Sequence, residues 1–151
     1  MSKESLLNLL KKHEINSELI VFEESVKDSK SSASASKLDL KKIVKTVTFK
    51  DKQKKVYAVI IRATERVCKS KLKGLVQKKL QLIPFDDVIK YTSFPAGGVP
   101  PFGYDAFFII DSDLSDLEEV LVGGGDIYSL LRIKIKDLKK LSSPVVCDVK
   151  Q

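Results

Sequence analysis

Residues 94–103 read F-P-A-G-G-V-P-P-F-G, and three glycines and three prolines fall inside this stretch. Proline fixes φ at about −65° and removes an amide donor, whereas glycine alone reaches positive φ without steric cost. The alternation of the two predicts a rigid, shaped loop. At Gly97 and Gly98 a ligand can lie directly against the backbone and meet its N–H groups. A purely structural crossover into the next strand is the alternative interpretation of such a loop.

The chain on either side of this loop alternates predicted helices and strands. Apolar residues at helical spacing predict a first helix that starts near Ser2 and ends at His13. Runs of β-branched residues predict strands at Ile43–Phe49 and Val56–Ile61, joined by a polar hairpin. The serine-rich segment Ser25–Ser36 is predicted to be a loop whose later part caps and begins a short helix ahead of Leu38 and Leu40. Further strands are predicted at Leu19–Phe22, Leu80–Ile83, Ala106–Ile110, Leu117–Val122 and Leu130–Ile135, and further helices around Leu72–Leu80, after Asp86 and at Asp137–Leu141.

This mixture predicts the fold class. Adjacent hairpins combined with interspersed short helices are typical of an α+β domain with a mixed, mostly antiparallel β-sheet flanked by short helices. No internal repeat and no linker divides the chain, so residues 1–151 are expected to form one domain.

Length and composition agree with a soluble globular domain. With 151 residues, 43% of them apolar and 31% charged, the chain can bury a core without disulfides. No apolar run approaches the roughly 18 residues of a membrane span, and no signal-peptide pattern is present. Cys68 and Cys147 belong to no CxxC pair, which favours free thiols and a cytoplasmic location. With one histidine and no metal-ligand spacing, the sequence predicts neither a metal site nor a cofactor.

Basic residues are concentrated in one part of the chain. Fifteen Lys or Arg and only three acids lie between Lys37 and Lys79, a local net charge of +12, while the whole chain carries +7. Residues 91–131 contain no Lys or Arg. This asymmetry favours a basic face that binds a polyanion, although a solvated lysine-rich surface produces the same count. No aromatic RNA-recognition motif is present, so contacts to a phosphate backbone are expected rather than base readout.

Three motifs carry a resemblance to a known family. The string G-G-V-P-P-F-G at residues 97–103 resembles the signature loop of the YbaK/EbsC family, free-standing domains related to the editing insertion of bacterial prolyl-tRNA synthetases. Two further stretches follow the family's order, namely I-V-K-T-V-T-F at 43–49 and V-G-G-G-D at 122–126. The similarity runs from about Ser34 to Leu141.

The resemblance implies a function. Because the family hydrolyses mischarged aminoacyl-tRNA, we expect a metal-independent deacylase that edits in trans, with tRNA for proline carrying alanine, cysteine or a similar small amino acid as substrate. The expected partners are the acceptor end of tRNA and an aminoacyl-tRNA synthetase. A non-catalytic tRNA- or synthetase-binding module with the same cleft is the alternative. A third hypothesis is a hydrolase or binding protein for a small acyl or nucleotide ligand.

Lys45 is the strongest single candidate for a catalytic residue. Strand alternation places it on one face with Ile43, Val47 and Phe49, where a lysine either lines a cleft or snorkels out from the strand end. The resemblance favours the cleft, because the family's key lysine lies in this strand. Its three donors would then hold a phosphate or ester oxygen.

The remaining candidates come from the same motifs. Gly97 and Gly98 are expected to offer amide donors to the oxyanion of ester hydrolysis. Since His13 is the only histidine and Cys68 has no patterned base, no protein nucleophile is predicted. The resemblance implies that catalysis relies on positioning by backbone groups, water and the substrate's own groups. Lysines predicted to contact tRNA are Lys69, Lys71 and Lys73. The expected substrate-binding residues are Thr46, Val99, Pro100, Phe102, Gly124, Gly125, Asp126 and Ser129.

Overall fold

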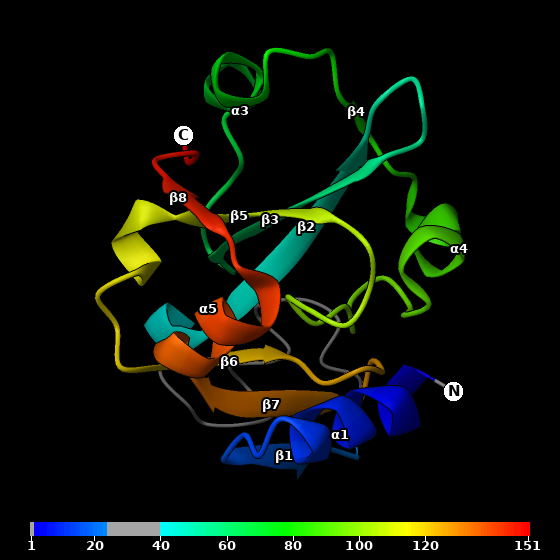
Figure 1. Cartoon of the computed structure of the whole chain (residues 1–151), viewed down its shortest axis with the longest axis vertical. Helices are drawn as coiled ribbons and strands as arrows, with labels where there is room; N and C mark the ends of the chain where they lie inside the picture. The colour runs from blue at the N-terminus through cyan, green and yellow to red at the C-terminus, as the bar shows by residue number, and fades with distance from the viewer. Residues whose placement is uncertain (1, 24–39) are drawn as a thin grey trace.

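The computed structural model describes residues 2–23 and 40–151, and the segment predicted at Ser25–Ser36 lies outside them. Within the described ranges, the predicted helices and strands are present with shifted ends (Figure 1). In chain order the elements, with η for 3-10 helices, are α1 (Ser2–Lys12), β1 (Ser17–Val21), η1 (Leu40–Lys42), β2 (Val44–Lys50), β3 (Val56–Arg62), α3 (Lys69–Val76), β4 (Gln81–Leu82), η2 (Phe85–Asp87), α4 (Val88–Thr92), β5 (Phe107–Asp111), η3 (Ser112–Leu114), β6 (Glu119–Gly123), β7 (Ser129–Lys134), α5 (Ile135–Ser142) and β8 (Val145–Cys147).

The strands form two sheets instead of the one expected from sequence. The larger sheet has the order β4-β2-β3-β5-β8; β2 is antiparallel to β3 and β4, and β5 is parallel to β3 and β8. The smaller sheet is antiparallel, in the order β1-β7-β6. A mixed α+β fold is therefore confirmed, and strand β8, which consists of three residues after a proline, was missed.

Alternation along β2 and β3 sends neighbouring side chains to different apolar clusters. Val44 and Ile60 belong to the main core, which lies between the two sheets and includes Val122 and Leu131. Residues of the opposite parity, such as Val59, pack with α3 in a second cluster. Lys45 thus projects from the face of β2 that is turned away from the main core.

The two sheets meet at the start of β2. Ile43 forms a parallel bridge with Leu121 of β6, and β2 and β6 then run side by side before they diverge. Extending this parallel register by two residues places Lys45 abreast of Gly123. The fold therefore brings two of the three predicted motifs together.

Candidate functional site

The loop at residues 94–103 is held in shape from both ends. At its start, the Phe94 amide donates to the Thr92 hydroxyl at 3.1 Å, and at its end the Tyr104 hydroxyl donates to the Pro100 carbonyl at 2.8 Å. Burial raises the pKa of Tyr104, so its hydroxyl stays protonated and remains a donor. Phe94 and Phe102 are fully buried in the main core. The loop is a fixed part of the core surface, as its Gly/Pro composition predicts.

Removing the hydroxyl of Tyr104 tests this anchoring. Tyr104→Phe keeps the ring against Phe94 and Phe108, at centroid distances of 6.0 and 5.3 Å, but leaves the Pro100 carbonyl without its donor. We expect the free energy of unfolding, measured by urea denaturation, to fall by about 1 kcal/mol. The matched control is Tyr128→Phe, because the Tyr128 side chain is 45% exposed. Equal effects of the two substitutions would show that the hydroxyl of Tyr104 does not secure the loop.

A second glycine loop, residues 123–126, packs backbone to backbone on the first. The Gly125 amide donates to the Gly98 carbonyl at 2.9 Å. A Cβ atom on Gly98 would lie 2.6 Å from the carbonyl carbon and oxygen of Asp126, and one on Gly123 would overlap the Val99 carbonyl oxygen. Only glycine permits this approach. We call the contact between residues 97–99 and 123–126 the glycine junction.

The backbone amides of the junction are unequally available. The Gly98 amide, predicted as an oxyanion donor, is committed to the Pro95 carbonyl at 2.9 Å in a turn that gives Gly97 a φ of 88°. The Gly124 amide donates to the Ser129 carbonyl at 3.2 Å, and the Gly125 amide donates to the Gly98 carbonyl. Gly97 is exposed, and its amide has no hydrogen-bond acceptor among the described residues. Of the two predicted oxyanion donors, Gly97 is therefore the one whose amide is free to meet a ligand.

Lys45 is half-buried and lacks a close partner. Its ammonium makes no hydrogen bond or ion pair with any residue that the structure describes. Desolvation lowers the pKa of Lys45, the nearby Arg66 guanidinium lowers it further, and the Glu65 carboxylate partly opposes both. Arg66 and Glu65 were not predicted, and only their position directly after the strand that pairs with β2 could have indicated them. A partly desolvated, unpaired cation of this kind is poised for an anionic or ester ligand.

Two buried hydroxyls next to the junction are also unpaired. Within the described ranges, the buried side-chain atoms without a hydrogen-bond partner are Thr46 Oγ1 and Ser129 Oγ. Thr46 follows Lys45 on β2, and Ser129 packs against Gly124 at the start of β7. Native proteins rarely leave buried hydroxyls unsatisfied. Ser129 lies close enough to the Asp126 carboxylate to lower its pKa, so Thr46 Oγ1 is the hydroxyl that calls for a water or a ligand. Both residues were among the substrate-binding candidates.

Other candidates have structural partners. The Asp126 carboxylate accepts from the Tyr128 amide at 2.8 Å and pairs with Lys3 of α1 at 3.2 Å. Partial burial would raise the pKa of Asp126, but these contacts and the nearby Ser129 hydroxyl outweigh it and lower the pKa. Asp126 thus ties α1 to the junction. The side chains of Val99, Pro100 and Phe102 are buried, so they support the loop from beneath.

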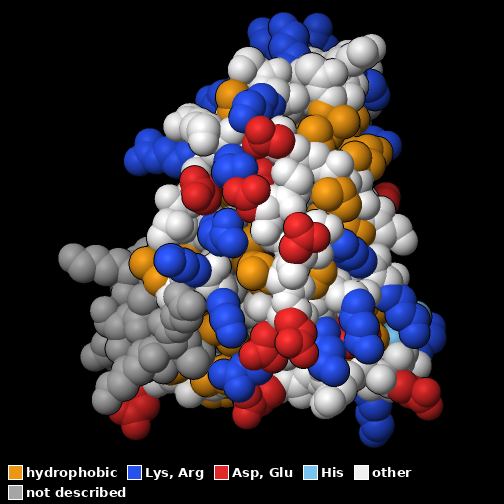
Figure 2. All heavy atoms as spheres, turned by 90° about the vertical axis from the view of Figure 1, so that its left-hand side faces the viewer, with side chains coloured by type: hydrophobic (Ala, Val, Ile, Leu, Met, Phe, Trp, Pro, Cys, Tyr) orange, Lys and Arg blue, Asp and Glu red, His pale blue; other side chains and the backbone are white. Residues whose placement is uncertain are grey.

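The three lysines predicted to bind tRNA also differ from one another. Lys71 donates to the Asp148 carboxylate at 2.9 Å and to the Lys150 carbonyl at 2.9 Å. Lys69 and Lys73 are exposed and form no ion pair with a described residue. Figure 2 shows basic side chains gathered at the end of the molecule that α3 forms, while charges of both signs mix lower down. Lys69 and Lys73 are available to a polyanion, whereas Lys71 is engaged.

Neither metal ligands nor a membrane span is found in the described part of the chain. Residues 2–23 and 40–151 contain no group of three or more His, Cys, Asp or Glu side chains that could hold a metal ion. None of the helices in these ranges is both long enough and apolar enough to cross a bilayer.

Comparison with known proteins identifies the family. Residues 23–141 match the aminoacyl-tRNA editing domain, so the chain belongs to that family and the resemblance seen in the sequence is confirmed. Over 104 residues it is 29% identical to the proline–tRNA ligase of Caldicellulosiruptor saccharolyticus and 30% identical to that of Caldicellulosiruptor bescii. These matches cover 68% of the chain but 18% of each ligase, so the chain spans about a fifth of their length.

Solved structures agree with this assignment. A structure described as a proposed trans-editing enzyme for prolyl-tRNA synthetase is similar with a TM-score of 0.87 at 26% identity, over 99% of this chain and 97% of that one. A protein described as hypothetical is similar with a TM-score of 0.89 at 26% identity, over 97% of this chain and 99% of that one. The described residues thus have the fold of the trans-editing domain.

Proposed function

We propose that this protein hydrolyses mischarged aminoacyl-tRNA in trans, with tRNA for proline carrying alanine, cysteine or a similar small amino acid as substrate. Family membership supports the editing reaction, and the likeness to a trans-editing domain and to proline–tRNA ligases supports the choice of tRNA. The observation that carries the proposal is the exposed Gly97 amide, which has no acceptor among the described residues, together with the Lys45 ammonium on β2, which makes no hydrogen bond or ion pair with them.

These groups fit ester hydrolysis. Water adds to the carbonyl carbon of the ester, and the bond to the ribose oxygen then breaks, which releases the free amino acid and restores the tRNA hydroxyl. The Gly97 amide would stabilise the oxyanion that forms on the carbonyl oxygen, a role worth about 3 kcal/mol of barrier for one preorganised donor. The Lys45 ammonium would hold a phosphate or ester oxygen of the terminal nucleotide. Positioning of water and substrate replaces a protein nucleophile in this mechanism.

Deacylation across a panel of charged tRNAs tests the proposal. The purified protein is expected to release alanine or cysteine from tRNA for proline at least tenfold faster than it releases proline, as measured by loss of labelled amino acid. Because no described donor set could hold a metal, the same rate is expected after incubation with EDTA. Absence of turnover on every charged tRNA, with tRNA binding retained, would replace this function by the non-catalytic binding module.

A basic surface is proposed to hold the tRNA backbone while the ester lies at the junction. Lys69 and Lys73 belong to this surface, because both are exposed and unpaired within the described ranges. Lys71 contributes to it less, since its ammonium is held by Asp148. Binding is therefore expected to weaken as salt rises, because each neutralised phosphate releases counterions.

A further inference from the structure

A hollow of about 330 Å³ lies beyond the far end of β2, away from the glycine junction. Asp51, Lys52, Gln53, Lys78 and Lys79 line it. It forms because β4 pairs with β2 in antiparallel register, Lys50 opposite Gln81, and two further steps bring Lys52 opposite Lys79. We call it the hairpin hollow.

The hairpin hollow has an excess of free positive charge. Asp51 is buried, and its carboxylate accepts from the amides of Gln53 and Lys55, both at 2.9 Å, and from the Tyr57 hydroxyl at 3.2 Å. Its negative charge is therefore satisfied by contacts within the fold, and the Lys78 ammonium lies 3.6 Å from the carboxylate. By contrast, Lys52 and Lys79 are exposed and make no ion pair within the described residues. The hollow therefore offers at least two free ammonium groups to an anion.

An exposed apolar face follows the hollow along the chain. Leu82, Phe85 and Ile89 are 51%, 65% and 53% exposed. Phe85 and Ile89 are four residues apart in the continuous helical stretch of η2 and α4, so they lie on one side of it. This stretch leads directly into the loop that carries Gly97. An exposed aromatic residue between lysines and a glycine-lined site is typical of a surface on which bases stack.

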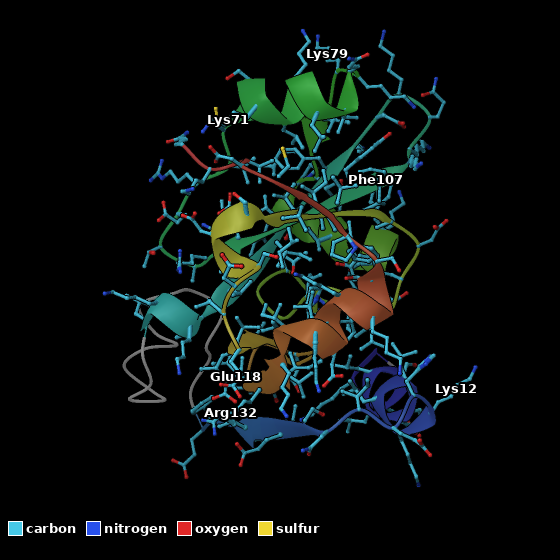
Figure 3. The ribbon with its side chains drawn as sticks, turned by 60° about the vertical axis from the view of Figure 1, so that its left-hand side comes forward. Lys12, Lys71, Lys79, Phe107, Glu118 and Arg132 are labelled. Atoms are coloured by element: carbon cyan, nitrogen blue, oxygen red, sulfur yellow. The ribbon has the colours of Figure 1, made fainter. Side chains whose placement is uncertain are left out.

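The spacing of these features favours a long anion. Lys45 and Lys50 are five residues apart on β2, about 17 Å at about 3.4 Å per residue, and the hollow lies further on. Figure 3 places Lys79 and Lys71 together at one end of the molecule and Lys12 at the other. A free phosphate occupies the hairpin hollow alone. A nucleic-acid strand, with one phosphate per about 3.4 Å in a duplex strand, can contact both the hollow and Lys45.

We propose that the hairpin hollow and the Phe85–Ile89 face form a track for one strand of RNA. The lysines of the hollow grip phosphates of the stem, and Phe85 stacks on a base of the single-stranded 3′ end as that end passes toward Gly97. The track deepens the proposed function and rests on it. It adds a base contact to the backbone contacts that the charge pattern predicts.

Binding to intact tRNA and to the same tRNA without its single-stranded 3′ end separates the two parts. Lys52→Glu with Lys79→Glu is expected to weaken binding of both RNAs at least tenfold and to reduce the salt slope by about two. Phe85→Ala is expected to weaken binding of intact tRNA about tenfold and to leave the trimmed tRNA unchanged, and Phe85→Trp is expected to restore binding. Inorganic phosphate at millimolar concentration is expected not to compete.

Two control variants match these changes. Lys11→Glu with Lys12→Glu makes the same change of net charge on the exposed side of α1, and Val146→Ala shortens a side chain that is 46% exposed elsewhere. Both are expected to change tRNA affinity less than threefold.

Three outcomes would contradict the track. Equal weakening of tRNA binding by the two charge pairs would overturn the contact between the hairpin hollow and phosphates. An unchanged affinity of Phe85→Ala for intact tRNA would overturn the base contact, and competition by polyglutamate as strong as by RNA would indicate an acidic protein as the partner.

Failure of the track and failure of the proposed function give different results. If the chain deacylates tRNA but the hollow variants behave like the α1 control, the track is wrong and the function stands. If the hollow variants lose RNA binding while no charged tRNA is hydrolysed, the track stands and the function is wrong.

Discussion

Gly98→Ala is expected to abolish deacylation and to lower the free energy of unfolding by about 1–3 kcal/mol, the usual cost of overpacking. A methyl group at this position would lie 2.6 Å from the backbone carbonyl of Asp126, which cannot rotate away as a side chain can. The two loops must therefore separate, and the hydrogen bond from the Gly125 amide to the Gly98 carbonyl is lost. Because Gly97 is bonded to Gly98, it moves as well, and its free amide is displaced from the position in which it would meet the ester.

The measurements are chemical denaturation and turnover on charged tRNA. Gly98→Val, with a larger side chain, is expected to lose more stability than Gly98→Ala. Gly74→Ala provides the control, because nothing lies within 4 Å of a Cβ at Gly74 in α3. Alanine there is expected to stabilise the helix by about 0.5–1 kcal/mol and to leave turnover intact. Wild-type activity in Gly98→Ala would mean that the close contact of the two loops is irrelevant to the reaction.

Local patterns predicted most of the elements and both glycine loops. The period-two alternation in Ile43–Phe49 and Val56–Ile61 specified β2 and β3 and the face on which Lys45 lies, because side-chain direction in a strand depends only on parity. The short strand β8 was missed, since three residues give no usable period. The division into two sheets was missed as well, because it depends on the long-range pairing of β1 with β7 and not on any local signal.

The roles of individual site residues were harder to predict than their presence. Sequence could identify Gly97 and Gly98 as a pair, but which amide is free depends on the turn that Pro95 closes. It could identify Lys71 as basic, but its pairing with Asp148 joins residues 77 positions apart. Lys3 was not considered, although its contact with Asp126 fixes α1 against the junction. These are tertiary contacts, and no motif encodes them.

Lys45→Ala is expected to reduce turnover at least tenfold while the thermal midpoint stays near that of the wild type. The ammonium has no partner among the described residues, so its loss leaves no buried group unsatisfied and removes a repulsion from Arg66. Lys45→Met is the matched variant, because it keeps an unbranched apolar stem on β2 and removes only the charge. If Lys45→Met loses stability but retains activity per folded molecule, Lys45 packs the strand and does not act on the substrate.

The pH dependence gives a second test of Lys45, through its neighbours. Desolvation first and Arg66 second lower the pKa of Lys45, and Glu65 raises it. If the reaction needs the protonated ammonium, turnover corrected for uncatalysed ester hydrolysis falls as pH rises through that pKa. Arg66→Gln removes a positive charge, so the fall in turnover is expected to move to higher pH. Glu65→Gln removes a negative charge, so the fall is expected to move to lower pH. Both variants leave Lys45 in place, so opposite displacements would identify its charge as the group that titrates, whereas two unchanged profiles would show that turnover does not depend on it.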